Sequence, residues 1–404
     1  FIVLFFMGVQ STFFGPVKYS IIPQHLREDE LVAGNAQVGM GTFVAILIGT
    51  IMGSLMGGAE NVIWLVGITV VSVATIGWVC SWRIPVAEAK ATDLKIDWNV
   101  PRVSWQLVKL SMEKQPVFLA ILGISWFWML GASYLTQMPN FTVTVLHGSP
   151  GVIAVVLCAF TVGIACGSLL CDRLSGRRVE IGLVPLGSLG LSAFGIDLYF
   201  AAQGYSGADG VSTFGFFAQT GSIRVLFDIA MIGLSGGLYI VPLYAMVQAR
   251  TEDSKRARVI ASNNILNALF MVVASLMGIV LLGVVGFTIP DLFLTLALMN
   301  IAIAVFIFFQ VPEFTMRFLV WLLSHSIYRV KHQGLEHIPN KGGAMIVCNH
   351  VSYLDALLLA GAVRRPIRFI MFKPIYEIPV LNFVFRTGGA IPICSRQHDE
   401  QGYE

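Results

Sequence analysis

Four polar residues near the carboxyl end of the chain have the types and the spacing of a catalytic group. They lie in the stretch CNHVSYLDALLL, residues 348–359, in the order N-H-x-S-x-x-D: Asn349, His350, Ser352 and Asp355. A histidine is a suitable base for removing a proton from an alcohol near neutral pH. A carboxylate five residues later can fold back onto the other ring nitrogen, where it fixes the tautomer and stabilises the imidazolium. The spacing predicts His350 as a general base and Asp355 as its partner, with Asn349 and Ser352 supporting the turn.

The residues on either side indicate which elements position this group. The apolar run Ala344–Val347 predicts a short buried strand before it. The leucines from 354 to 359 follow with helical spacing. His350 is therefore expected where a strand passes into a helix. A surface loop that contains His and Asp by chance is the alternative interpretation, and the flanking pattern favours the catalytic one.

The stretch NHVSYLD resembles the H-x4-D block of the glycerolipid acyltransferases, which move an acyl chain from a thioester to a glycerol hydroxyl. Residues 328–348 resemble the beginning of that domain. Residues 369–393 resemble its second block, with Lys373 and Pro379 at matching positions. The resemblance implies an acyl thioester of acyl carrier protein or coenzyme A as the donor substrate, and no bound cofactor.

The resemblance also implies a role in holding the substrate phosphate or headgroup for Lys373 and Arg396. The arginine of the family follows the G-x-I-x-I stretch directly, whereas here Ser395 has that place and Arg396 comes one residue later. The later E-G-T-R block of the family does not occur before Glu404. We therefore expect residues 331–404 to be an incomplete acyltransferase domain, inactive in acyl transfer by itself.

The composition places most of the chain in a membrane. Of the 404 residues, 56% are hydrophobic and only 12% are charged, and the mean hydropathy is +0.77. Such a composition excludes an ordinary soluble protein and gives no reason to expect a nucleic-acid partner. The six cysteines have no paired spacing that suggests a metal site or a disulfide framework. We expect reduced thiols and no bound metal.

Nine apolar segments are long enough to span a bilayer. They lie near 1–16, 31–57, 62–82, 117–139, 150–171, 180–203, 222–247, 258–285 and 289–311. Residue 1 is not a methionine and already lies inside an apolar run, so we expect a fragment that lacks both ends.

Lys and Arg are concentrated in alternate connections between these segments. The basic connections are 17–30, 83–116, 172–179 and 248–258. The other connections, 58–61, 140–149, 204–221 and 286–288, contain neither residue. Because basic loops remain on the cytoplasmic side, the chain is expected to emerge into the cytoplasm after Val311. We expect a multi-pass membrane protein with a cytoplasmic C-terminal domain.

A weak internal repeat indicates two halves. Residues 15–24 and 31–36 resemble residues 240–248 and 259–264, with a period of six spans. The expected domains are the last three spans of an N-terminal half (1–82), a cytoplasmic central linker (83–116), a six-span C-terminal half (117–311), an amphipathic interfacial connector (312–330) and the acyltransferase part (331–404).

Two six-span halves with a cytoplasmic middle loop resemble the major facilitator superfamily. The stretch GSLLCDRLSGRR, residues 167–178, resembles the loop motif G-x-x-x-D-R-x-G-R-R of that family. The resemblance implies a loop that latches one conformation through Asp172, Arg173, Gly176 and Arg177; an ordinary basic turn is the alternative. The expected fold is mainly α: a polytopic helix bundle with nine of twelve spans, followed by the front of an α/β domain.

Polar residues inside the spans are candidates for a transport path, because each is costly in lipid unless it is used or paired. Arg224 and Asp228 stand at i and i+4 near the outer end of their span, a spacing that lets them pair on one helix face. Asn263 and Asn35 are further candidates. Hydrogen bonding that only holds the helices together is the alternative, and for the asparagines it is favoured.

Taken together, the chain resembles bacterial fusions of a lysophospholipid transporter with a 2-acylglycerophosphoethanolamine-type acyltransferase. The resemblance implies that the protein lies in the bacterial inner membrane, that the transporter part flips lysophospholipid inward and that the enzyme part re-acylates it on the cytoplasmic face. Its partners are then membrane lipids, lysophospholipid and acyl carrier protein. Two alternatives remain open: an exporter of a small solute or drug with a regulatory C-terminal domain, and an acyltransferase whose membrane part is only an anchor.

Overall fold

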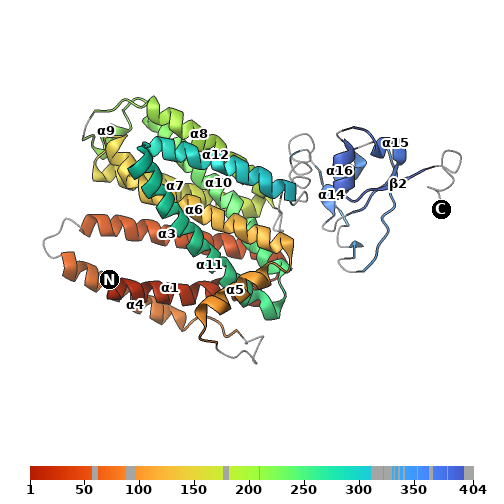
Figure 1. Ribbon diagram of the computed structural model, residues 1–404, viewed down its shortest axis with the longest axis horizontal. Coiled ribbons are helices and arrows are strands. Elements are labelled where there is room, and N and C mark those ends of the chain that lie inside the picture. Colours follow the sequence, from red (N-terminus) through yellow and green to blue (C-terminus); the bar gives the residue numbers. More distant parts are fainter. Residues whose placement is uncertain are drawn as a thin grey trace. The chain divides into compact units, whose positions relative to one another are not determined.

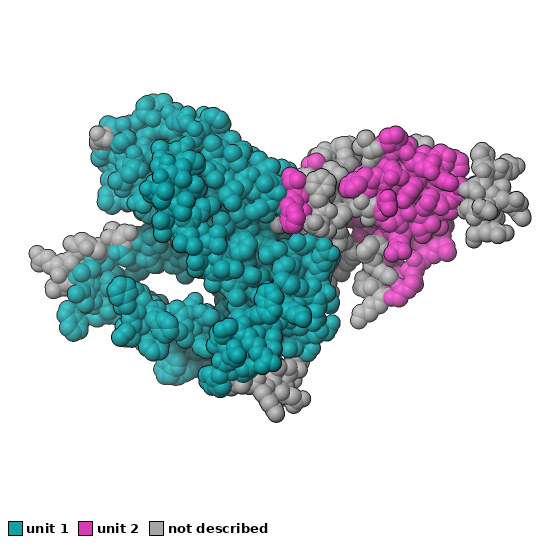
Figure 2. All heavy atoms as spheres, viewed as in Figure 1, with its two compact units in different colours: residues 1–179, 186–304 teal, residues 180–185, 305–404 magenta. Residues whose placement is uncertain are grey.

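The computed structural model separates into two compact units (Figure 2). The first contains residues 1–179 and 186–304, and the second contains residues 180–185 and 305–404. The structure describes the chain except for residues 57–61, 88–96, 176–181, 209, 311–321, 323–329, 332, 335–336, 340–341, 353, 364–366, 380 and 395–404. The expected connector 312–330 falls almost wholly outside the described residues.

Long helices form the first unit, and residues 183–185 and 305–310 of two of them are assigned to the second (Figure 1). They are α1 (Ile2–Ser20), α3 (Leu31–Met56), α4 (Val62–Ser81), α6 (Gln115–Thr144), α7 (Pro150–Leu174), α8 (Leu183–Gln203), α10 (Ser222–Arg250), α11 (Asp253–Gly278) and α12 (Ile289–Gln310). A π-helical turn, Ile279–Val285, extends α11. Shorter helices are α2 (Ile22–His25), a 3-10 turn (Glu28–Glu30), α5 (Val100–Ser111) and α9 (Thr213–Phe216). Each predicted apolar segment contains one long helix, which confirms the mainly α architecture.

Eight helices in the described part of the chain are long and apolar enough to cross a membrane. The first predicted segment, 1–16, is helical as α1 but is not among the eight. This helix carries Gln10, Thr12 and Lys18, and these polar groups lower its hydropathy. The chain is nonetheless a multi-pass membrane protein.

Glycines let α7 and α10 pack backbone to backbone. Gly163 and Gly167 stand four residues apart on α7, and Gly233 and Gly237 stand four apart on α10. A Cβ added at any of the four would lie 2.0 to 2.5 Å from a carbonyl oxygen of the facing helix. Such stripes of small residues let membrane helices approach closely, where van der Waals packing drives association. The two helices therefore form a close-packed pair inside the bundle.

Hydrogen bonds of a buried tryptophan and a buried asparagine join three helices in the interior of the first unit. Trp126 on α6 is 2% exposed and donates from Nε1 to Oδ1 of Asn300 on α12 at 2.8 Å. Nδ2 of Asn300 donates to the carbonyl oxygen of Ser188 at 2.9 Å and to Oγ of Ser192 at 2.8 Å, both on α8. A fully satisfied polar network of this kind fixes the mutual position of three helices.

The second unit contains a small parallel β-α-β arrangement. Its elements are α14 (Asp355–Ala362), β1 (Ile370–Phe372), α15 (Lys373–Tyr376), α16 (Leu381–Thr387) and β2 (Ile391–Ile393). The two strands are parallel, with Ile370 opposite Ile391 and Phe372 opposite Ile393. Parallel pairing requires a crossover, which α15 and α16 provide.

The prediction of a strand at residues 344–347 is wrong, because the structure has no strand there. The segment has no regular secondary structure, and Met345 is 88% exposed. A buried strand needs a neighbouring strand and a covering layer, whereas within the described residues β1 and β2 pair only with each other. His350 therefore follows an irregular segment, and the helix predicted after it is present as α14.

Candidate functional site

The His350 ring and the Asp355 carboxylate are in contact. Nδ1 of His350 lies 3.0 Å from Oδ2 of Asp355, the contact expected from their spacing. The imidazole is 70% exposed and the Asp355 side chain 24% exposed. A carboxylate at Nδ1 holds the ring proton there and leaves Nε2 as the basic nitrogen. The pair can therefore act as a general base on a hydroxyl group from solvent or lipid; its catalytic role stays a prediction.

The same carboxylate oxygen organises the turn that begins α14. Oδ2 of Asp355 accepts hydrogen bonds from the backbone N–H of Ser352 at 2.8 Å and of Val351 at 2.7 Å. Oγ of Ser352 accepts one from the N–H of Leu354 at 3.2 Å. These backbone donors, with His350 adding to them, hold the pKa of Asp355 below its ordinary value. Asp355 is thus kept charged while it orients the imidazole.

The other residues expected at the acyl-transfer site are placed as follows. Asn349 is exposed and directly precedes His350. Lys373 begins α15 directly after β1, at the carboxyl end of a parallel strand, where ligands of α/β sheets commonly bind. Arg396 lies outside the described residues. A phosphate contact by Lys373 or Arg396 stays a prediction.

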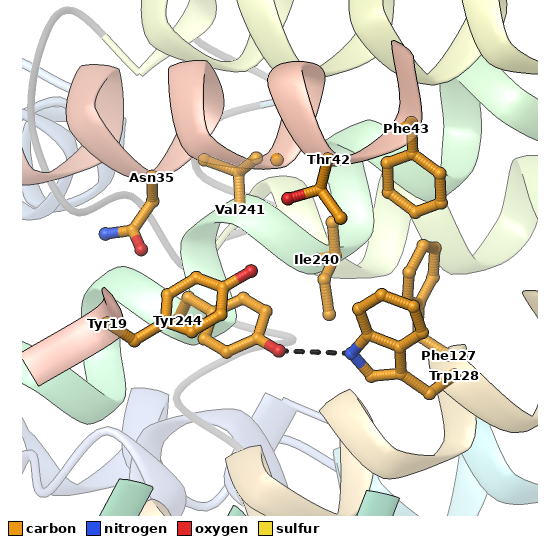
Figure 3. Close-up of a pocket in the computed structure, with 10 residues that line it drawn as sticks. Tyr19, Asn35, Thr42, Phe43, Phe127, Trp128, Ile240, Val241 and Tyr244 are labelled. Carbon is orange, nitrogen blue, oxygen red and sulfur yellow. Dashed lines mark hydrogen bonds between the residues drawn. The ribbon is translucent and has the colours of Figure 1, made fainter. Parts of the chain in front are cut away.

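A small pocket lies between α1, α3, α6 and α10 (Figure 3). Tyr19 stacks on Tyr244 with ring centroids 4.4 Å apart, and Phe43 stacks on Trp128 at 5.9 Å. Nε1 of Trp128 donates to the Tyr244 hydroxyl at 3.1 Å (Figure 3). The side chains leave room for about one water molecule. In this conformation the aromatic residues close the space between the first helices of the chain and α10.

Asn35 takes part in an amide pair at one end of this pocket. Its Nδ2 donates to Oε1 of Gln248 at 2.6 Å, and Nε2 of Gln248 donates back to Oδ1 of Asn35 at 3.1 Å. Gln248 also donates to the carbonyl oxygen of Tyr19 at 3.1 Å. Both amides are almost completely buried, at 2% and 1% exposure. Asn35 therefore joins α3 to α10 by hydrogen bonds. This is the packing role given above as the alternative to a place in the transport path.

Asn263 on α11 has a different environment. It is 1% exposed, and neither its Oδ1 nor its Nδ2 has a hydrogen-bond partner. It lies beside the side chain of Tyr244, which lines the pocket. A buried amide without partners is costly and calls for an explanation. Asn263 is thus a better candidate than Asn35 for contact with a transported molecule.

Arg224 and Asp228 do not pair with each other, although their i, i+4 spacing allows it. The guanidinium instead binds Asp197 on α8: Nε donates to Oδ2 at 3.1 Å, and Nη2 donates to Oδ1. Asp228 is completely buried, and no donor reaches either of its carboxyl oxygens. Helical spacing favours partners on the same helix, whereas Asp197 lies 27 residues earlier. The two predicted residues therefore belong to a cluster of three.

The predicted latch loop is described only at its beginning. Asp172 and Arg173 lie in the last turn of α7, where Arg173 is exposed and Oδ1 of Asp172 is buried without a hydrogen-bond partner. Gly176 and Arg177 lie outside the described residues. The latch contact stays a prediction.

Sequence reasoning missed several residues that the structure brings to these sites. Gln248 ends the second copy of the repeat as Gln24 ends the first, so the repeat itself was a usable signal. Lys18 was counted as a basic loop residue, but it lies on α1, with Nζ 3.2 Å from Oγ1 of Thr42 and 4.8 Å from the centroid of the Tyr19 ring. Asp197 was identifiable only as a charge inside a span.

Two protein families match the chain. Residues 1–223 match the Major Facilitator Superfamily, which is more than half of the chain. Residues 329–403 match the Acyltransferase family. The first match covers long helices from α1 to α8, and the second includes His350, Asp355 and Lys373.

The curated relatives fall into the same two groups. "Lysophospholipid transporter LplT" of Serratia proteamaculans is 25% identical over 254 residues, 61% of this chain and 58% of that protein. The protein of the same name from Escherichia fergusonii is 23% identical over 252 residues, 61% of this chain and 58% of that protein. An uncharacterized protein of Mycobacterium leprae is 32% identical over 78 residues, 17% of this chain and 21% of that protein. The chain thus spans 58% of the length of these two transporters.

Proposed function

Because the chain belongs to the major facilitator superfamily and carries a C-terminal acyltransferase domain, we propose that it moves lysophospholipid across the bacterial inner membrane and re-acylates it on the cytoplasmic face. The observation that carries this proposal is the presence of both domains on one chain whose transporter relatives are named for lysophospholipid. A lysophospholipid has one free glycerol hydroxyl, which is the acceptor group that a glycerolipid acyltransferase needs.

In the proposed reaction the glycerol hydroxyl attacks the carbonyl carbon of an acyl thioester. Nε2 of His350 takes the hydroxyl proton, while Asp355, at 3.0 Å from Nδ1, keeps the ring oriented and stabilises its positive charge. When the tetrahedral intermediate collapses, the C–S bond breaks and His350 returns the proton to the leaving thiolate. The products are the ester of a diacyl phospholipid and a free thiol of acyl carrier protein or coenzyme A.

The remaining predicted residues have supporting roles in this scheme. Ser352 and Asn349 hold the turn that presents His350. Lys373 and Arg396 neutralise the phosphate of the acceptor lipid. In the membrane part, Arg224, Asp228 and Asn263 belong to the transport path, and Asn35 closes it. Asp172, Arg173, Gly176 and Arg177 latch one conformation.

The joining of the two activities has a physical advantage. Lysophospholipid released at the inner surface emerges beside the enzyme, so its local concentration there exceeds that in the bulk membrane. This arrangement requires the C-terminal domain to be cytoplasmic, as the distribution of Lys and Arg predicts.

The test uses the full-length protein in membranes, with re-acylation and uptake of labelled lysophospholipid measured in parallel. General-base catalysis contributes about 10²–10⁴ in rate, so His350→Ala should lose most acyl transfer. Uptake should remain near the wild-type level, since His350 is outside the spans. Gln106→Ala, at an exposed position of α5 in the central linker, serves as the control and should keep both activities.

The outcomes also separate the alternatives. Normal acyl transfer by His350→Ala would exclude the proposed chemistry. Acyl transfer without any uptake would favour an anchored acyltransferase. Efflux of small solutes without lysophospholipid uptake would favour an exporter with a regulatory domain.

A further inference from the structure

The helix α5, in the central linker, has two faces of different character. Its inner face packs against α11, with Val108 and Ser111 buried and Oγ of Ser262 donating to Oγ of Ser111 at 3.2 Å. The opposite face is exposed and carries four side chains at helical spacings of three and four residues: Arg102, Trp105, Lys109 and Met112. These four form an outer stripe, in which cationic and large apolar side chains alternate.

The apolar members of the outer stripe are largely uncovered. Trp105 is 64% exposed and Met112 is 43% exposed. Trp98, which directly precedes the N-cap residue Asn99, is 85% exposed. Neighbouring apolar groups of this size are unfavourable in water, and such a surface marks contact with lipid or with another protein.

The cationic members of the outer stripe have no acidic partner on the protein. Within the residues that the structure describes, neither the Arg102 guanidinium nor the Lys109 ammonium takes part in an ion pair. The next charged residue, Glu113, is instead paired with Lys255 on α11, at 2.8 Å. The outer stripe is therefore a positively charged surface, which suits an anionic partner.

The place of α5 in the chain puts the outer stripe at the membrane surface. The linker joins two consecutive spans, α4 and α6, so both of its ends lie on one side of the membrane. Where α4 ends, Trp78 and Trp82 meet edge to face at 4.8 Å and are 61% and 69% exposed, and tryptophans concentrate at the boundary of lipid and water. Three residues after α5, Nζ of Lys114 donates to the carbonyl oxygen of Arg250, at the end of α10. With 12 residues, α5 is too short to cross a bilayer, so it lies at this boundary.

We propose that α5 is an interfacial anchor whose outer stripe binds anionic phospholipid in the leaflet on the side of the central linker. Trp105 and Met112 enter the boundary between headgroups and acyl chains, as the apolar side of an interfacial helix does. Arg102 and Lys109 stand seven residues apart, about 10 Å along the helix, so each binds the phosphate of a different lipid molecule. Because the inner face of α5 bonds Ser262, the anchor holds the beginning of α11 at the membrane surface.

An acidic protein is the other class of partner that a positive surface attracts. The membrane is favoured for two reasons: it lies at the level of the outer stripe, and its acyl chains cover the apolar area of Trp105 and Met112. A soluble protein would have to enter the headgroup layer to cover the same side chains.

The first experiment locates the outer stripe with nitroxide labels. The full-length protein, with its native cysteines replaced, carries a label at Met112→Cys or at Gln106→Cys and is placed in nanodiscs of phosphatidylcholine and phosphatidylglycerol. The label at position 112 should be reached more by oxygen, which dissolves in lipid, than by a water-soluble nickel chelate. Gln106 is exposed beside the outer stripe, so the label at position 106 is the matched comparison and should be reached more by the chelate. Neither lysophospholipid nor an acyl donor is present, so the result does not depend on the proposed function.

The second experiment tests the charges of the outer stripe. Arg102→Gln and Lys109→Gln should each lower the ratio of lipid-inserted to water-exposed label at position 112, by about fivefold, in nanodiscs that contain phosphatidylglycerol. In pure phosphatidylcholine the same variants should leave the ratio unchanged. Lys331→Gln with Arg386→Gln removes two exposed cations of the second unit. This charge-matched control should have no effect in either lipid.

The third experiment tests the apolar contribution of the indole. Trp105→Ala should lower the inserted fraction of the label at position 112 in both lipid compositions, whereas Trp105→Phe, which keeps an apolar ring, should retain it. An inserted fraction that is the same in both variants and in the wild type would exclude Trp105 from the anchor.

The labels also distinguish the other occupants of the outer stripe. Access mainly by the nickel chelate at position 112 would show that the stripe faces water, and access by neither reagent would show that protein covers it. Chelate access that is lost only when acyl carrier protein is added would assign the stripe to an acidic protein. An inserted fraction that is equal with and without phosphatidylglycerol would refute the binding of anionic lipid. Each of these four results overturns the proposed anchor.

Discussion

One carboxylate oxygen of Asp355 serves both the turn and the imidazole, so different substitutions there separate structure from catalysis. In Asp355→Asn the amide oxygen can still accept hydrogen bonds from Val351 and Ser352, but the negative charge is gone. We expect the turn to remain and acyl transfer by the full-length protein to fall by about 10²–10⁴-fold. Asp355→Ala should lose the same activity and also free the two backbone N–H groups.

Hydrogen exchange at the amides of Val351 and Ser352 checks this separation. The exchange should be faster in Asp355→Ala than in Asp355→Asn or the wild type. Glu377→Gln, which removes a carboxylate elsewhere in the same unit, is the matched control. It should change neither the rate of acyl transfer nor the hydrogen exchange of the two amides. Equal exchange in both Asp355 variants would contradict the role of Oδ2 in the turn.

The pKa of Asp355 gives a second prediction about a single residue. Backbone donors lower its pKa in the folded protein below the ordinary value of 3.8. The resulting stabilisation is present above the unfolded pKa and is lost as the pH falls through the folded pKa. Carboxyl carbon NMR of the full-length protein should therefore give a midpoint below 3.8 for Asp355. A midpoint at or above that value would mean that the Val351 and Ser352 hydrogen bonds do not persist in solution.

Distance along the chain decides how much of each site the sequence could predict. The contact between His350 and Asp355 spans five residues, so local turn chemistry was enough to predict it. Arg224 was assigned a partner within its own helix, but its partner Asp197 is 27 residues away. Spacing along one helix cannot describe which face of another helix lies opposite, because that is set by packing of the whole bundle.

At the scale of elements, the long helices were predictable and their pairing was not. Apolar length alone located each long helix, although α6 runs to Thr144, beyond Pro139, where the prediction ended. The strand predicted at 344–347 failed because a strand is stabilised by a partner that the segment itself does not encode. The close approach of α7 and α10 was likewise hidden among the 40 glycines of the chain, most of which could serve either packing or bending.

The glycine contact between α7 and α10 is testable by adding one methyl group. A Cβ at Gly167 would lie 2.0 Å from the carbonyl oxygen of Leu234, so the helices must move apart. Overpacking of this kind costs about 1–3 kcal/mol, and Gly167→Ala should lower the thermal unfolding temperature in detergent. Gly49→Ala is the control, because its Cβ would meet nothing within 4 Å. Equal unfolding temperatures in the two variants would show that the helices are not in backbone contact.

At the scale of the whole molecule, the proposed chemistry depends on which side of the membrane each loop faces. In a variant whose native cysteines are replaced, Ala218→Cys and Trp98→Cys introduce single thiols at exposed positions. An impermeant maleimide should label the cysteine at position 218 in intact cells, but the one at position 98 only after permeabilisation. The reasons are the lack of Lys and Arg in 204–221 and their abundance in 83–116. The reverse pattern would place His350 on the side opposite a cytosolic acyl donor.

The amide pair of Asn35 and Gln248 has an energetic consequence for the proposed transport function, which requires helices to separate and return. Water can replace each hydrogen bond of a separated amide, so the net cost of breaking one is about 0.5–1.5 kcal/mol. Lipid chains offer no such replacement, and separation toward them would leave both amides unsatisfied. The hydrogen bonds among Asn35, Gln248 and the carbonyl oxygen of Tyr19 therefore break at low cost only where water can reach the separated groups. Separation of the helices toward the lipid chains is disfavoured.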